Sequence, residues 1–186
     1  ANSKGEITIP TADGEVGVVK TIDGKSYLFN SDGEMVTGLR ILTYDGSKIT
    51  NISSEVDTAD TVKNMNSDTM KLVYFESNGA AKTGTTTITL DGTSYTFSFK
   101  SNGSPRGVGE TGISDGYIYQ NGLRLTADED TKYGVVTYKN ESYVVNEKGS
   151  IQKNKKNLKD ADETYYCTNA KGILLHSSTE KCTTKH

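Results

Sequence analysis

Tryptophan is absent from this 186-residue chain, and proline, cysteine and histidine occur only twice each. No apolar run approaches the roughly 20 residues of a membrane-spanning helix, so we expect no membrane span. Hydrophobic residues make up only 33%, but the net charge is just −3, whereas disorder normally combines low hydrophobicity with high net charge. We therefore expect an ordered protein with many small cores and no electrostatic attraction to nucleic acid or anionic membranes.

Residue patterns typical of catalysis or metal binding are lacking as well. Neither His176 nor His186 has a neighbouring partner pattern, and Asp128-Glu129-Asp130 lacks calcium-ligand spacing. The string from Gly107 to Gly112 looks like a phosphate loop, but no strand and helix flank it. Because no set of nucleophile, base and orienting residue can be assembled, we predict no enzyme activity, no catalytic residue, no metal site and no cofactor.

The two cysteines, Cys167 and Cys182, lie near the C-terminus. A bridge between them would close a short loop and stabilise the fold by roughly 3 kcal/mol. Two free thiols are the preferred interpretation, and the bridge is the alternative, because this spacing favours neither a metal site nor a disulfide framework.

A repeated pattern is the strongest positive signal in the sequence. Tyr27–Gly38 and Val73–Gly84 both contain Phe four residues before a first Gly, and a second Gly five residues after it. Looser copies follow around Phe99–Gly103, Tyr143–Gly149 and Tyr165–Gly172. The chain is therefore a repeat protein, whose fold must be considered repeat by repeat.

Each repeat is expected to be a β-hairpin, because Asp-Gly between β-prone segments strongly favours a tight turn. The expected hairpins centre on Asp23-Gly24, Asp91-Gly92, Asn121-Gly122 and Lys139-Asn140. One hairpin cannot bury its aromatic face alone, so consecutive hairpins must stack. We predict an all-β fold, an elongated β-hairpin solenoid of stacked repeats with almost no helix.

The repeats are expected to form one array over 17–176, preceded by a lead-in strand or arm (1–16) and followed by a frayed tail (177–186). The strand at Leu39–Tyr44 is not followed by a partner strand at the expected spacing, and a polar stretch comes instead. We therefore expect an inserted loop at about 50–69, with a short helix possible at Ser54–Lys63.

Strand alternation divides the aromatic residues between two faces. The expected repeat core consists of Tyr27, Phe29, Met35, Phe75, Phe97, Phe99 and Tyr143. The outward positions, five residues before each turn glycine, are Leu28, Tyr74, Ser98, Tyr117 and Val144. The candidate ligand-binding residues are Tyr74, Tyr117, Tyr119, Tyr138 and Tyr165, since tyrosine offers a sugar both a flat face and a hydroxyl.

Gly17–Gly38, in which Asp23-Gly24 precedes Tyr27-Leu28-Phe29, resembles the cell-wall-binding repeat family. That family includes choline-binding modules, glucan-binding repeats and the C-terminal repeats of large clostridial toxins. Gly33–Gly38 is similar to its Gly-x-Met-x-x-Gly ending, and Gly79–Gly84 carries Ala81 at the methionine position. The resemblance implies a β-hairpin solenoid and non-catalytic attachment to a surface.

Choline in that family is held by tryptophan and tyrosine side chains, because a quaternary ammonium offers no hydrogen bonds and is attracted by cation–π contact. This chain has no tryptophan. Of the outward positions, only Tyr74 and Tyr117 are aromatic. Choline binding is therefore disfavoured.

The resulting functional hypothesis is an extracellular, cell-surface module that binds carbohydrate on a bacterial cell wall or a host cell. Its expected partners are such a glycan and another domain of a parent protein, with no nucleic acid. The alternative is a structural spacer or protein-interaction array that presents another domain. Glycan identity and oligomeric state are not specified by the sequence.

Overall fold

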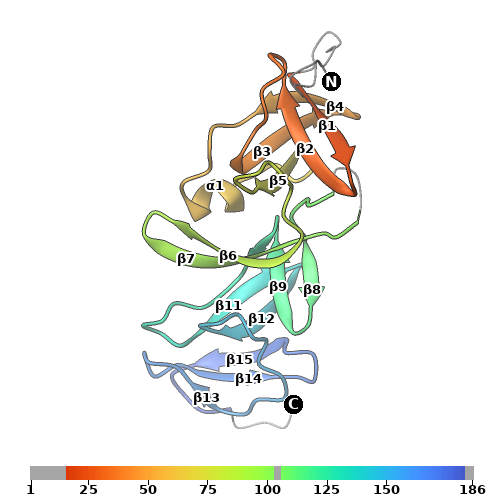
Figure 1. The fold of residues 1–186 in the computed structure, drawn as a ribbon. Coiled ribbons are helices and arrows are strands. Elements are labelled where there is room, and N and C mark those ends of the chain that lie inside the picture. Colours follow the sequence, from red (N-terminus) through yellow and green to blue (C-terminus); the bar gives the residue numbers. More distant parts are fainter. Residues whose placement is uncertain (1–15, 103–105, 183–186) are drawn as a thin grey trace. The chain divides into compact units, whose positions relative to one another are not determined.

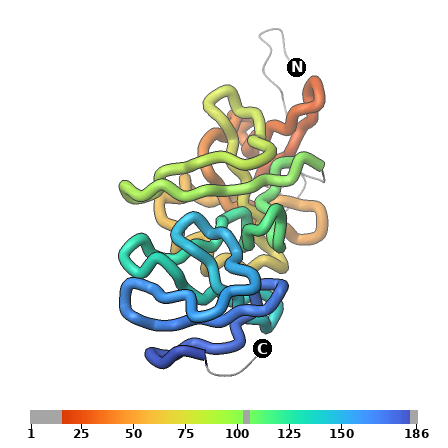
Figure 2. Tube along the Cα trace, turned by 90° about the horizontal axis from the view of Figure 1, so that it is seen from below, coloured from red at the N-terminus to blue at the C-terminus, as the bar shows by residue number. Residues whose placement is uncertain are grey.

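The computed structural model describes residues 16–102 and 106–182, and it is all-β, with 51% strand and 3% helix. The chain divides into two compact units, each described separately here. The first comprises the residues up to Glu110 together with Gln120–Leu123, and the second comprises Thr111–Tyr119 and the residues from Arg124 onward. Figure 1 labels the elements, and Figure 2 traces the chain through successive hairpins, including the long hairpin of β6 and β7.

In the first unit, five strands form one antiparallel sheet in the order β2-β1-β4-β3-β5. These are β1 (Gly17–Ile22), β2 (Lys25–Asn30), β3 (Gly38–Asp45), β4 (Lys48–Ile52) and β5 (Met70–Phe75). The helix α1 (Ala59–Lys63) lies between β4 and β5 in the chain, and β6 (Gly84–Leu90) pairs with β7 (Thr93–Phe99). The expected partner of Leu39–Tyr44 is thus not missing: β4 follows at once and pairs with β3.

The remaining strands belong mainly to the second unit. They are β8 (Gly112–Ser114), β9 (Tyr117–Gln120), β10 (Leu123–Arg124), β11 (Tyr133–Tyr138), β12 (Glu141–Asn146), β13 (Leu158–Lys159), β14 (Tyr165–Thr168) and β15 (Leu174–Ser178). Strand β8 pairs with β9, β11 pairs with β12, and β14 pairs with both β13 and β15.

The predicted turn chemistry is confirmed at the hairpin tips. Asp23 and Gly24 have φ of 50° and 78°, and Asp91 and Gly92 have 49° and 76°. Positive φ at both central residues is the turn whose twist matches that of the paired strands, which is why Asp-Gly occurs there.

A second type of turn recurs along the chain. Asn30, Asn146 and Asn169 each stand three residues before a glycine, and each side-chain oxygen accepts amide hydrogen bonds from the residues two and four further on, at 2.9 to 3.0 Å. Asp160 makes the same pair of bonds, and Glu163 has φ of 65° where the other turns have glycine. The Asp160–Glu163 turn was not predicted, because it lacks the glycine that marks the others.

The repeats contact each other in a regular way: the residue two after one turn glycine packs on the next turn glycine. The pairs are Met35 on Gly79, Ala81 on Gly107 and Gly109 on Gly122 in the first unit, and Arg124 on Gly149 and Ile151 on Gly172 in the second. A β-carbon at any of these five turn glycines would lie 3.0 Å or closer to an atom of its partner. Of the expected turn glycines, Gly103 lies outside the described residues, and Gly107 makes the packing contact.

Of the expected repeat core, Phe29, Phe75, Phe97, Phe99 and Tyr143 lie buried, and Tyr27 is half-buried. Met35 corrects the prediction, because 43% of its surface stays exposed although its side chain covers Gly79. The packing is across a turn, where only one side of the thioether chain is covered.

The outward face is also corrected. Leu28 and Val144 have no exposed surface, and Ser98 is only 6% exposed. Each of these strands is covered on both sides by neighbouring segments, and a strand buried on both faces loses the alternation that assigns an inner and an outer side.

The second unit is closed by a disulfide between Cys167 and Cys182, whose Cα atoms are 6.7 Å apart, so the preferred free thiols are wrong. Asn157 contacts both cysteine segments: its side-chain oxygen accepts the amide of Cys182 at 2.7 Å, and its amide donates to the sulfur of Cys167 at 3.2 Å. The lead-in at 1–16 lies outside the described residues except for Val16. The array limits, the insertion at 50–69 and the tail at 177–186 stay predictions; Ser177 and Ser178 end β15.

Candidate functional site

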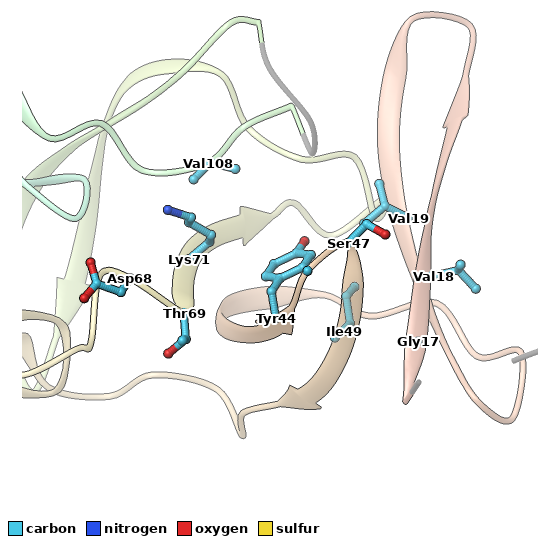
Figure 3. A pocket seen from close by; sticks show the side chains of 11 residues that line it. Gly17, Val18, Val19, Tyr44, Ser47, Ile49, Asp68, Thr69, Lys71 and Val108 are labelled. Carbon is cyan, nitrogen blue, oxygen red and sulfur yellow. The ribbon is translucent and has the colours of Figure 1, made fainter. Parts of the chain in front are cut away.

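A pocket of about 570 Å³ opens in the first unit beside Tyr44 (Figure 3). It is lined by Gly17, Val18, Val19, Tyr44, Gly46, Ser47, Ile49, Asp68, Thr69, Lys71 and Val108. These residues come from β1, from the turn between β3 and β4, from the start of β5 and from the segment before β8. Four stretches far apart in sequence thus form one site.

Tyr44 is placed by a break in the strand pairing. The register between β3 and β4 shifts between Thr43 and Tyr44, so that Tyr44 pairs with Ile49. The extra residue is Thr50 of β4, so β4 is the bulged strand opposite Tyr44. The amide of Tyr44 donates to the carbonyl of Thr69 at 2.8 Å, which ties β3 to the residues preceding β5.

The hydroxyl of Tyr44 is the distinctive group of the pocket. It is buried, and it has no hydrogen-bond partner among the described residues. Burial raises the pKa of Tyr44 from 10.0 to about 12, because ionisation would place a charge in a desolvated position. Buried polar groups are nearly always hydrogen-bonded, so this unpaired hydroxyl is an exception within the fold.

Other polar groups lie on the pocket wall. Ser47 and Thr69 carry hydroxyls, Asp68 a carboxylate and Lys71 an ammonium that also donates to the carbonyl of Ser67 at 3.3 Å. In Figure 3, Tyr44 and Lys71 project toward the side on which Val108 lies. Valine and isoleucine side chains complete the wall, so the pocket combines an aromatic ring, donors, acceptors and an apolar surface.

The tyrosines predicted to bind ligand do not come together with this pocket. Tyr74 is half-buried and packs on the core around Leu39, Leu72 and Phe97, so its ring is partly used by the fold.

Tyr117 and Tyr119 are both engaged by Arg124. The guanidinium carbon lies 3.6 Å from the ring centroid of Tyr117, and the guanidinium donates to the Tyr119 hydroxyl at 2.8 and 3.2 Å. Tyr119 is only 4% exposed, so its assignment as a surface ligand residue is corrected. Arg124, two residues after a turn glycine, packs on Gly149 and contacts both tyrosines, so its side chain covers part of them.

Tyr138 and Tyr165 also have cations of the chain over their rings. The ammonium of Lys139 lies 5.5 Å from the Tyr138 centroid, and those of Lys159 and Lys181 lie 6.0 and 5.9 Å from that of Tyr165. Cation–π attraction within about 6 Å of a ring is therefore already satisfied internally at these tyrosines. This arrangement does not favour an external quaternary ammonium.

In the part of the chain that the structure describes, no group of three or more histidine, cysteine or acidic side chains is arranged to hold a metal ion. Within the same residues, no helix has the length and apolarity needed to cross a membrane.

No protein-family model and no curated protein matches the sequence. Among solved structures, CbpJ from Streptococcus pneumoniae TIGR4 aligns with a TM-score of 0.50 at 19% identity, over 84% of this chain and 58% of CbpJ. The fold is shared with CbpJ. This chain thus spans less than two thirds of CbpJ, and the likeness concerns the fold alone.

Two further structures align more loosely. Choline binding protein F from Streptococcus pneumoniae has a TM-score of 0.33 at 17% identity, over 85% of this chain and 47% of that protein. Alternansucrase in complex with isomaltononaose has a TM-score of 0.29 at 15% identity, over 86% of this chain and 15% of the enzyme. At these scores neither alignment bears on the site.

Tyr44 was not among the predicted ligand tyrosines, because the repeat pattern does not single it out. The one local signal is Tyr44-Asp45-Gly46, a tyrosine at a tight turn, and it does not reveal a bulge. The other lining residues become neighbours only through pairing between distant strands.

Proposed function

We propose that this chain is a non-catalytic attachment module that binds carbohydrate on a bacterial cell wall or a host cell, through the pocket at Tyr44. The observation that carries the proposal is the buried Tyr44 hydroxyl, which has no hydrogen-bond partner among the described residues. The hydroxyl has almost no accessible surface, so a ligand hydroxyl reaches it when the Tyr44 side chain shifts, and the new hydrogen bond then recovers free energy lost on burial.

Carbohydrate fits the remaining chemistry of the pocket. A sugar presents several hydroxyls and an apolar ring face, and the wall offers the carboxylate of Asp68, the ammonium of Lys71 and the hydroxyl of Ser47 around an aromatic ring. Binding pockets generally combine an apolar lining with a few converging polar groups. The pocket volume of about 570 Å³ is within the range common for small ligands.

A location outside the cell, at a surface, is part of the same proposal. The Cys167–Cys182 disulfide supports it, because disulfides persist mainly in oxidising compartments. The fold shared with CbpJ, a protein of a bacterium, supports a bacterial origin for the module. A further domain in a longer protein stays a proposal, as does membership of the cell-wall-binding repeat family.

The test is to compare the wild type with Tyr44→Phe on a glycan array and on purified bacterial cell walls. The substitution keeps the ring and removes the hydroxyl, so it should lower glycan retention about tenfold while leaving the melting temperature unchanged or slightly higher. Tyr95→Phe is the matched control, because Tyr95 is half-buried in the same unit but lies outside the pocket, and its loss should leave retention unchanged.

Other outcomes would contradict the proposal in distinct ways. Wild-type protein that is retained on neither surface would favour the spacer alternative. Retention that Tyr44→Phe does not reduce would place the glycan elsewhere. Retention that free choline competes away would show that choline was wrongly disfavoured.

A further inference from the structure

A second pocket of the first unit, about 330 Å³ in volume, gathers positive charge. It is lined by Gly24, Lys25, Glu76, Ala80, Ala81, Lys82, Thr83, Ser101 and Arg106. Three cations thus stand against one carboxylate. None of these lining residues belongs to the Tyr44 pocket.

The segments that carry the three cations are joined by direct contacts. The Arg106 guanidinium donates to the carbonyl of Gly24 at 2.5 Å, next to Lys25. The amide of Ala81, next to Lys82, donates to the carbonyl of Ser26 at 2.8 Å. The fold therefore holds the Arg106 guanidinium and the backbone of Lys25 and Lys82 around one pocket.

Gly107 allows the segment that carries Arg106 to approach the backbone of Ala81 and Lys82 closely. A β-carbon there would lie 2.8 Å from the carbonyl oxygen of Lys82 and 2.9 Å from the β-carbon of Ala81. This close approach is the same repeat contact that joins successive turns in the first unit. The cationic cluster is thus built on the repeat packing itself.

The positive charges are not neutralised by neighbouring carboxylates. The ion pair that the described residues form is that of Lys159 with Glu163 in the second unit, and Lys25, Lys82 and Arg106 form none with described carboxylates. Lys82 is half-buried, so its charge is screened less than that of a fully exposed lysine. Gathering three positive charges around the single carboxylate of Glu76 is unfavourable unless a further anion joins them.

We propose that this pocket binds a tetrahedral oxyanion, a phosphoryl or sulfate group, with Lys25, Lys82 and Arg106 as its donors. Arginine suits such a group because its planar guanidinium can offer two parallel hydrogen bonds, and lysine adds a compact point charge. Glu76 limits affinity by repelling the anion. The inference does not depend on carbohydrate binding at Tyr44.

The test is an NMR titration of ¹⁵N-labelled protein at constant ionic strength, with inorganic phosphate in one arm and a sulfated heparin hexasaccharide in the other. Saturable shifts at the amides of Lys25, Lys82 and Gly107 are expected. Response to both probes would identify a site for free anions, and response to the hexasaccharide alone would identify a site for anionic glycans. Both outcomes support the pocket, and saturable shifts in neither arm would overturn it.

Charge variants of opposite sign make the assignment specific. Lys82→Gln should weaken binding about tenfold, and Glu76→Gln should strengthen it about threefold, because they change the pocket charge in opposite directions. The matched control is Lys20→Gln, which removes the same charge from β1 outside the pocket and should change affinity less than about twofold. Equal losses of affinity for Lys20→Gln and Lys82→Gln would show that binding depends only on the net charge of the protein, and would refute the site.

Arg106→Lys is a second test of the arginine, because it keeps the positive charge and loses the paired hydrogen bonds. It should bind more weakly than wild type but more tightly than Arg106→Gln. Tyr44→Phe should leave anion binding unchanged, so failure at one pocket is distinguishable from failure at the other.

Discussion

The rings of Phe97 and Phe99 lie nearly parallel, with 8° between their planes and 6.1 Å between their centroids. Two residues apart on β7, they share one face of the strand and join a core with Leu39, Leu72 and Leu123. The pair therefore connects the β6–β7 hairpin to the rest of the first unit.

Phe99→Ala should lower the free energy of unfolding of this unit by roughly 3 to 5 kcal/mol, because it leaves a cavity next to Phe97. Urea unfolding followed by circular dichroism measures the loss. Thr93→Ala, at the exposed start of the same strand, should change stability by less than about 0.5 kcal/mol. Similar losses in the two variants would mean that β7 is not anchored by its phenylalanines.

The crowded turn glycines provide a prediction with a close internal control. Gly172 and Gly116 have φ of 87° and 82°, but only at Gly172 would a β-carbon collide, with Ile151, whereas nothing lies within 4 Å at Gly116. Gly116→Ala should therefore cost about 1 to 2 kcal/mol of backbone strain, and Gly172→Ala should cost clearly more. The difference between their urea midpoints isolates the repeat contact, and equal midpoints would show that it contributes nothing.

Alkaline pH should destabilise both units. Burial raises the pKa of Tyr44 to about 12, and burial together with the hydrogen bond to Asp160 and the charges of Asp160 and Asp162 raises that of Tyr166 to about 12. The unfolded chain releases these protons near pH 10, so the free energy of unfolding should fall between pH 10 and 12, by up to about 1.4 kcal/mol per pH unit for each tyrosine.

Urea unfolding at pH values from 8 to 11.5 measures this slope, and Tyr44→Phe and Tyr166→Phe separate the two contributions. Tyr44→Phe should flatten the slope without lowering stability at pH 8. Tyr166→Phe should also lower stability at pH 8, because it leaves the buried Asp160 without the donor that lies 2.9 Å away. Unchanged slopes in both variants would contradict the prediction.

Sequence reasoning succeeded where structure is local. Asp23-Gly24 and Asp91-Gly92 specify their turns through their own backbone preferences, and the spacing of Phe29 and Gly33 predicted a repeat of hairpins. The same reasoning failed where the burial of a residue depends on segments that are distant in the sequence. Leu28 is buried because another part of the chain covers its face, which strand alternation does not encode.

The candidate site likewise depends on contacts between segments that are distant in the sequence. Nothing next to Tyr44 predicts that Thr69 will bind its amide or that Lys71 and Val108 will line the same pocket. Tyr119 and Arg124 flank the predicted Asn121-Gly122 turn, but the sequence does not show that the Arg124 side chain also packs on Gly149.

The contacts between turns also determine where repeats can be exchanged. Met35 and Gly79 must remain matched in size, as must Ala81 and Gly107, since each glycine accommodates the residue donated by the preceding repeat. A recombination point between Met35 and Gly79, or between Ala81 and Gly107, would separate such partners. A crossover at Ala80 keeps both pairs intact. The unit that can be exchanged between such chains therefore begins just after one turn glycine and ends at the next.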